Sequence, residues 1–155
     1  MASFVNAADA VAAAVEIETR GHAFYLAVTE KATEAEDKEF FAFMAEEEKR
    51  HKAIFSSMLS RIGGVPLPAG SSDDEYLMYV QDLLDSHSLF MKDQHKVILA
   101  DPYVEAIRFE KDTLLFFVAL ESMVPASEVQ YIRACADEER KHLRMLAKRM
   151  AGEKA

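Results

Sequence analysis

A seven-residue charged stretch occurs twice in this chain, and it constrains the fold more than any other feature. Residues 45–51 read Ala-Glu-Glu-Glu-Lys-Arg-His, and residues 136–142 read Ala-Asp-Glu-Glu-Arg-Lys-His. In both copies a histidine follows a glutamate by three residues. Because residues three apart lie on one face of an α-helix, such a pair can bind one metal ion together. One copy would carry little weight, since charged helices contain this pair by chance.

The composition favours an all-helical protein. Half of the 155 residues are apolar, and 5 glycines and 4 prolines interrupt the chain. At this length we expect one domain over residues 1–155. The net charge of −9 argues against nucleic-acid binding. We expect neither a signal peptide nor a membrane span, because no apolar run reaches about 18 residues. The single cysteine, Cys135, fits a cytoplasmic protein.

The first helical hairpin is predicted over residues 6–62. Its two helices are expected over about 7–32 and 34–62, with apolar residues at steps of three and four. Each helix has a capping signal at its start, Asn6 with Asp9 for the first and Thr33 with Glu36 for the second.

A crossover is predicted over residues 63–100. Residues 63–70 hold three glycines and two prolines, which indicates a break in regular structure. A capping box of Ser72 with Glu75 predicts a short helix to about Asp85, and a second short helix is expected over about 88–95. A link of about 30 residues can cross the full length of a helical bundle.

The second hairpin is predicted over residues 101–150. Asp101 followed by Pro102 is a strong helix start, and this helix is expected to end near Ser122. Pro125 marks the next turn, after which a fourth helix is expected over about 126–150.

The two hairpins also align outside the charged stretch. Residues 18–25 match residues 110–117, and both segments begin with a glutamate that an aromatic pair follows after two turns. The chain is therefore interpreted as a duplicated hairpin. In each hairpin the two aligned glutamates lie about equally far from the turn, at about 22 Å. Four glutamates and two histidines should then meet at mid-bundle.

Carboxylates in an apolar interior need protons or cations, because burying an unpaired charge costs several kcal/mol. Two divalent cations would balance four carboxylates. Carboxylate and imidazole donors without a thiolate suit iron or manganese, and zinc less specifically. The alternative is that these glutamates lie on solvent-exposed faces. In that case the apolar periodicity of both hairpins would not mark the buried faces of their helices.

With these motifs the chain resembles the ferritin-like superfamily, and within it the rubrerythrin-type proteins. The resemblance implies an all-α four-helix bundle with a long crossover between the second and third helices, and two iron ions per chain. We expect Glu48 and Glu139 to bridge the ions, with Glu18 and Glu110 terminal. The metal ligands implied are Glu18, Glu48, His51, Glu110, Glu139 and His142.

The chain departs from its relatives at three points. Rubrerythrins have a further carboxylate three residues after the third-helix glutamate, where this chain has Thr113. They usually add a rubredoxin domain with paired C-x-x-C motifs, which this chain lacks, so we expect an external electron donor such as a rubredoxin-like protein. The ligand set is similar to that of bacterioferritin, but Lys49 replaces the methionine that binds haem there, so no haem is expected.

Five further residues are candidates for a role at or near the site. Tyr25, seven residues after Glu18 in the same apolar stripe, is a candidate catalytic residue, with a core aromatic as the alternative. His22 is expected to support the site by a hydrogen bond rather than as a ligand. Cys135 is expected to be a small buried side chain. His87 and His95 are expected on the surface.

The favoured function is a di-iron oxidoreductase of peroxidase or ferroxidase type, which reduces peroxide or dioxygen while ferrous iron is oxidised. One alternative is an iron-storage protein in which the site is a ferroxidase. Another is a metal-stabilised bundle without turnover. We expect a cytoplasmic homodimer with no nucleic-acid or membrane partner.

Overall fold

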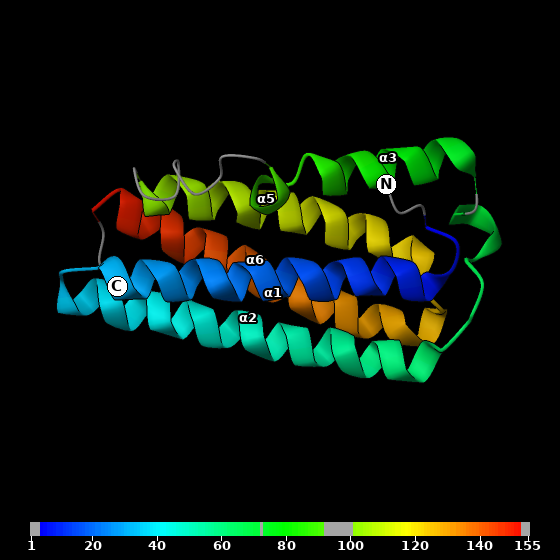
Figure 1. The fold of residues 1–155 in the computed structure, drawn as a ribbon, viewed down its shortest axis with the longest axis horizontal. Coiled ribbons are helices and arrows are strands. Elements are labelled where there is room, and N and C mark those ends of the chain that lie inside the picture. The colour runs from blue at the N-terminus through cyan, green and yellow to red at the C-terminus, as the bar shows by residue number, and fades with distance from the viewer. Residues whose placement is uncertain (1–3, 72, 92–100, 153–155) are drawn as a thin grey trace.

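The computed structural model describes residues 4–71, 73–91 and 101–152, which form a bundle of helices (Figure 1). Two long helices form an antiparallel hairpin in each half of the chain. This confirms the predicted all-α fold, which is consistent with a ferritin-like bundle. The long helices are α1 (Ala7–Lys31), α2 (Ala35–Ile62), α5 (Pro102–Leu120) and α6 (Val129–Met150).

Two of the predicted helix starts are confirmed. At α1 the backbone N–H of Asp9 donates to the Asn6 side chain, and the Asp9 carboxylate accepts from the N–H of Asn6. At α5 the carboxylate of Asp101 accepts from two backbone N–H groups of the first turn, and Pro102 occupies the position that needs no donor.

The other two predicted caps were wrong. Glu34, not Thr33, precedes α2, and no side-chain hydrogen bond caps this helix. Residues 32–34 alone join α1 to α2, and Glu34 adopts an extended conformation before the helix begins. The cap of α3 (Asp74–Asp85) is Asp73, whose carboxylate accepts from the N–H groups of Glu75 and Tyr76. Ser72 lies outside the described residues.

The crossover carries the chain from one end of the bundle back to the other (Figure 1). The break after α2 is confirmed, because Gly63 adopts a positive φ of 52° there. A single 3₁₀ turn, η1 (Ala69–Ser71), then leads to α3, which packs along α5. The next turn, η2 (Ser88–Phe90), contacts both α1 and α5. Residues 92–95 of the helix predicted over 88–95, including His95, lie outside the described residues.

The connection between the two helices of the second hairpin is longer than predicted. The α-helical part of α5 ends at Leu120, and two 3₁₀ turns follow before α6 begins at Val129. These turns are η3 (Glu121–Met123) and η4 (Ala126–Glu128).

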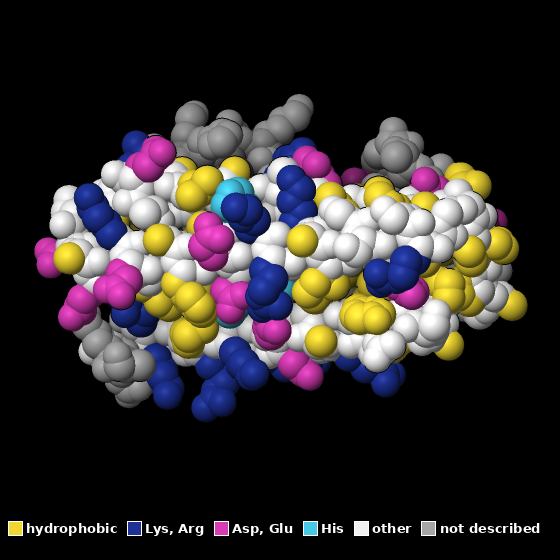
Figure 2. All heavy atoms as spheres, turned by 90° about the horizontal axis from the view of Figure 1, so that it is seen from below, with side chains coloured by type: hydrophobic (Ala, Val, Ile, Leu, Met, Phe, Trp, Pro, Cys, Tyr) yellow, Lys and Arg dark blue, Asp and Glu magenta, His cyan; other side chains and the backbone are white. Residues whose placement is uncertain are grey.

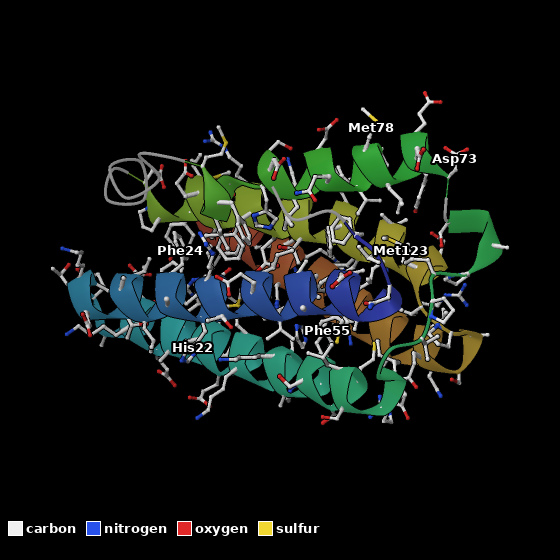
Figure 3. All side chains as sticks on the ribbon, turned by 45° about the vertical axis from the view of Figure 1, so that its right-hand side comes forward. His22, Phe24, Phe55, Asp73, Met78 and Met123 are labelled. Carbon is white, nitrogen blue, oxygen red and sulfur yellow. The ribbon has the colours of Figure 1, made fainter. Side chains whose placement is uncertain are left out.

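A polar layer divides the apolar core into two clusters. One cluster contains Phe55 and Met123, and the other contains Phe24. Figure 3 shows these side chains on either side of the middle of the bundle. Between the clusters lie buried glutamates and histidines from all four long helices. A buried layer of this kind has to satisfy its own charges.

The surface carries charges of both signs. Figure 2 shows Lys and Arg interspersed with Asp and Glu over the face on which α2 lies. Among residues 4–71, 73–91 and 101–152, no helix combines the length and apolar character needed to cross a bilayer.

Candidate metal centre

The structure brings the six predicted site residues together at mid-bundle. Their ligand atoms form two groups of four, and within each group all atoms lie within 4.8 Å of one another. Glu48 and Glu139 belong to both groups, which is the arrangement expected of bridging carboxylates. The first group is Glu18, Glu48, His51 and Glu139, and the second is Glu48, Glu110, Glu139 and His142.

The two histidines turn the same ring nitrogen toward the centre. Nδ1 of His51 lies 2.8 Å from Oε1 of Glu139, and Nδ1 of His142 lies 3.4 Å from Oε2 of the same carboxylate. Their rings stack at a centroid distance of 5.8 Å. Both imidazoles can therefore offer Nδ1 as a metal donor.

Glu138 holds the outer side of His51. Its Oε2 lies 2.9 Å from Nε2 of His51, and the same carboxylate accepts from Arg50. A carboxylate on Nε2 favours the tautomer in which Nε2 carries the proton and Nδ1 keeps its lone pair. Glu138 was missed at the sequence level, although its position directly before Glu139 in the repeated stretch was a usable signal.

Several buried polar atoms at the centre have no hydrogen-bond partner, although native proteins rarely leave such atoms unsatisfied. All of them belong to the six site residues, whose exposed fractions are 2% or less. A shared pair of cations accounts for them together, so the donor set fits two metal ions. These atoms are Glu18 Oε1 and Oε2, Glu48 Oε1, Glu110 Oε2, Glu139 Oε2 and His142 Nδ1.

The carboxylates perturb one another strongly. Burial and the neighbouring charges raise the pKa of Glu48 and of Glu110 well above the ordinary value, and burial raises the pKa of Glu18. Burial also acts to raise the pKa of Glu139, but its close contacts with Glu110 and both histidines lower it overall. Without a cation, the cluster therefore retains protons that a metal would displace.

The same contacts keep a proton on His51. Burial acts to lower its pKa, but the hydrogen bond to Glu139 and the nearby carboxylate of Glu18 raise it to about 10. A metal ion at Nδ1 has to displace this proton, so that metal binding at this group should release it.

Tyr25 lies directly against the centre. Its hydroxyl donates a 2.7 Å hydrogen bond to Oε1 of Glu110, and its side chain is fully buried. Burial and the charge of Glu110 raise the pKa of Tyr25 well above its usual value. The phenol therefore stays protonated and fixes the orientation of one carboxylate.

Gly21 allows the close approach of Glu48 to α1. A Cβ at this position would lie 3.2 Å from Cδ and 3.3 Å from Oε2 of Glu48. Such contacts are tighter than side chains ordinarily tolerate. The absence of a side chain at Gly21 thus leaves room for a carboxylate that both groups share.

Two other predicted residues do not belong to the groups. Nδ1 of His22 donates to the backbone oxygen of Ala45 at 2.8 Å, so its bond links α1 to α2 rather than to a site side chain. Cys135 is buried, as predicted, and burial raises the pKa of its thiol to about 12. Such a thiol stays protonated and unreactive.

The surface prediction for His87 was wrong. The side chain is fully buried, its Nε2 donates to the hydroxyl of Thr113 at 2.9 Å, and its Nδ1 accepts from the N–H of Leu89. Burial lowers the pKa of His87 to about 4, so the ring is neutral. The partner, Thr113, stands where the resemblance led us to expect a carboxylate. No local signal in the crossover pointed to this pairing.

Comparison with protein families supports this geometry. The Rubrerythrin family model matches residues 9–80, which include α1, α2 and the start of α3. Residues 9–80 belong to the rubrerythrin family. The matched segment holds Glu18, Glu48 and His51, and the internal repeat relates the donors of α5 and α6 to them. Neither the curated proteins nor the solved structures gave a match.

Proposed function

We propose that this chain is a di-iron oxidoreductase that reduces hydrogen peroxide or dioxygen and takes its electrons from an external donor. The observation that carries the proposal is the pair of buried donor groups that share Glu48 and Glu139. The rubrerythrin match to residues 9–80 supports it. Iron suits the mixture of carboxylate and imidazole donors, with manganese and zinc as the other candidates.

The proposed ligand roles follow the geometry. Glu48 and Glu139 lie between the two positions, Glu18 and His51 complete one group, and Glu110 and His142 complete the other. When bound, two iron ions supply two electrons to an O–O bond. The side chains of this chain then have to orient the site and exclude bulk water.

Several groups perform that work. Tyr25 orients Glu110 through its hydroxyl, and Glu138 orients His51 through Nε2. The apolar clusters on either side keep water away from the carboxylates, which strengthens electrostatic interactions inside the layer.

The direct test uses protein produced in iron-replete cells. We expect metal analysis to give about two iron ions per chain, and we expect the anaerobically reduced protein to be reoxidised stoichiometrically by peroxide or dioxygen. Glu48→Gln should lose both properties, whereas Glu46→Gln, on the exposed face of α2, should keep them. If neither oxidant reoxidised the reduced wild-type protein, the proposal would be wrong.

We also propose a homodimer in the cytoplasm. Exposed apolar side chains on α3 and α5, including Met78, Leu115 and Val118, support a self-association surface. Size-exclusion chromatography tests this point. A closed cage of many subunits would instead favour iron storage, with the same site serving as a ferroxidase.

A further inference from the structure

A line of aromatic rings leads from the metal centre toward one end of the bundle. It begins at Tyr25, which donates to Glu110. The ring of Phe41 lies 6.0 Å from that of Tyr25, nearly parallel to it, and the ring of Tyr103 lies 5.1 Å from that of Phe41. Neighbouring rings at these centroid distances are in contact. The three residues come from α1, α2 and α5.

The outer end of this line is a hydrogen-bonded phenol. The hydroxyl of Tyr103 donates to Oδ1 of Asp37 at 2.8 Å and accepts from Nε of Arg149 at 3.2 Å. Arg149 also donates to Asp37 at 2.8 Å. Tyr103 thus has a carboxylate placed to receive its proton.

Tyr103 and Phe41 also line a pocket of about 250 Å³. Val28 and Pro102 contribute apolar walls, and Lys31 and Asp37 contribute charged groups. Apolar cavities of about 150 Å³ already bind benzene. The pocket therefore has room for one substituted aromatic ring, with apolar faces to stack on it and polar groups to meet its hydroxyls.

Among the residues that the structure describes, the corresponding position in the second hairpin offers no such route. Phe117 replaces Tyr25 there, and its ring lies 5.0 Å from that of Phe55. Both rings are fully buried and belong to the other apolar cluster.

We propose that this pocket binds a small hydroquinone and that Tyr103, Phe41 and Tyr25 carry its electrons to the metal centre. This inference rests on the proposed oxidoreductase function and identifies the chemical class of the external donor. It also places the site of electron uptake on a surface that the first hairpin and α5 form together.

One electron moves in each step. Tyr103 gives an electron through Phe41 and Tyr25 to the oxidised centre, and its phenolic proton passes to Asp37. The hydroquinone in the pocket then gives a hydrogen atom to the tyrosyl oxygen, which restores the phenol. Asp37 releases its proton to solvent, and the hydroquinone departs with one electron and one proton fewer. A second hydroquinone repeats the step.

The first arm of the test measures binding on metal-free protein. Methylhydroquinone is titrated into protein with labelled valine and alanine methyl groups. We expect saturable NMR shifts at Val28, which lines the pocket, and none at Val118, on the exposed face of α5. Shifts at neither residue, or equal unsaturated shifts at both, would overturn the pocket assignment.

The second arm measures electron transfer. Iron-loaded protein is oxidised with peroxide, the excess is removed, and methylhydroquinone is added anaerobically while the absorption of the centre is followed. Tyr103→Phe should slow the re-reduction by about tenfold or more. Phe41→Leu, which removes a ring from the middle of the line, should slow it as well. Tyr131→Phe is the matched control, because Tyr131 is an exposed tyrosine on α6 beside Arg61.

The outcomes separate this inference from the proposed function. If peroxide oxidises the wild-type centre and both variants are re-reduced as fast as the control, the aromatic line is overturned and the oxidoreductase function stands. If peroxide does not oxidise the wild-type centre, the proposed function fails, and with it the electron route. Thermal melts of each variant confirm that the protein is folded before its rate is compared.

Discussion

Gly21 of α1 and Thr113 of α5 occupy equivalent positions of the repeat, each three residues after a site glutamate, but one has no side chain and the other makes a hydrogen bond. Gly21 leaves a space that the carboxylate of Glu48 fills. Thr113 instead presents a hydroxyl to His87, which the crossover brings against α5. The first hairpin thus makes room for a carboxylate that both groups share, whereas in the second a side chain from outside the repeat, His87, packs at the equivalent position. Duplication has preserved the donors while their supports have diverged.

The largest expected effect is on metal affinity, when a carboxylate that belongs to both donor groups is removed. Glu48→Gln and Glu139→Gln each remove a carboxylate that belongs to both groups, so each should weaken both metal sites by about 100-fold or more. Glu18→Gln and Glu110→Gln should weaken one site strongly and leave the other nearly intact. Calorimetric titration with Zn²⁺ measures this. Four equivalent losses would contradict the bridging assignment.

The next prediction concerns His87, which packs against Thr113 of the second hairpin. The pKa of His87 is lowered from 6.5 to about 4 in the folded protein. A histidine with a lowered folded-state pKa stabilises the fold above pH 6.5, and that contribution is lost as the pH falls from 6.5 toward 4. We expect the metal-free wild-type protein to lose up to about 3 kcal/mol from this group.

Urea unfolding of wild type and His87→Gln across this range gives the measurement. The free energy of unfolding of the variant should depend less on pH, because glutamine does not titrate. Asp112 and Arg20, the charged neighbours of His87, are unchanged in both proteins. Parallel pH profiles would show that His87 is not the group responsible.

A third prediction compares the replacement of Gly21 by alanine with the replacement of Thr113 by alanine. Gly21→Ala should raise the intrinsic helix stability by about 1 kcal/mol but displace Glu48, which should lower the metal affinity by about tenfold. Thr113→Ala should leave the affinity nearly unchanged. It should lower the free energy of unfolding by about 1–3 kcal/mol, because Nε2 of His87 loses its partner.

Each of these two variants is the control for the other, with zinc titration and thermal unfolding as the measurements. Equal losses of affinity in both would mean that Thr113 also supports the metal ligands. An unchanged affinity in Gly21→Ala would mean that Glu48 can shift without cost.

The smallest expected effect on stability comes from the exposed basic residues of the repeated seven-residue stretch. Arg50 contacts Glu47 and Glu138, and its counterpart in the second copy is Lys141. Arg50→Lys replaces a forked donor by a single ammonium group at a partly exposed site, so the loss of stability should be about 0.5 kcal/mol. Lys141→Arg should have no measurable effect. Chemical denaturation at low and high salt compares the two, and a larger loss at high salt would exclude an ionic origin.

The sequence predicted those features that depend on local spacing. The caps at Asn6 and Asp101 were predictable because side chain and backbone partners lie within one turn. The meeting of Glu48 with Glu110 and Glu139 was predictable because the repeat and the helix rise place these residues at the same height. The roles of these residues as metal ligands remain a prediction, which the zinc titration addresses.

Features that depend on distant partners were not predictable. His87 gained its buried position from Thr113, 26 residues away, and nothing in the short crossover elements indicates which helix they cover. Phe41 and Tyr103 come from different hairpins. The apolar pattern of each helix does not determine how the two hairpins are rotated relative to each other, so this contact was not predictable. The capping box predicted at Thr33 is absent, because α2 begins one residue later, after an extended Glu34.

The division of the donors between the hairpins has a consequence for biosynthesis. Three donors of each group come from one hairpin and the fourth from the other, so neither hairpin completes a group alone. During translation, α1 and α2 are synthesised well before Glu139, which lies near the end of the sequence. If the groups bind metal as proposed, metal capture would be deferred until translation is nearly finished, and a truncated product would lack a complete donor group.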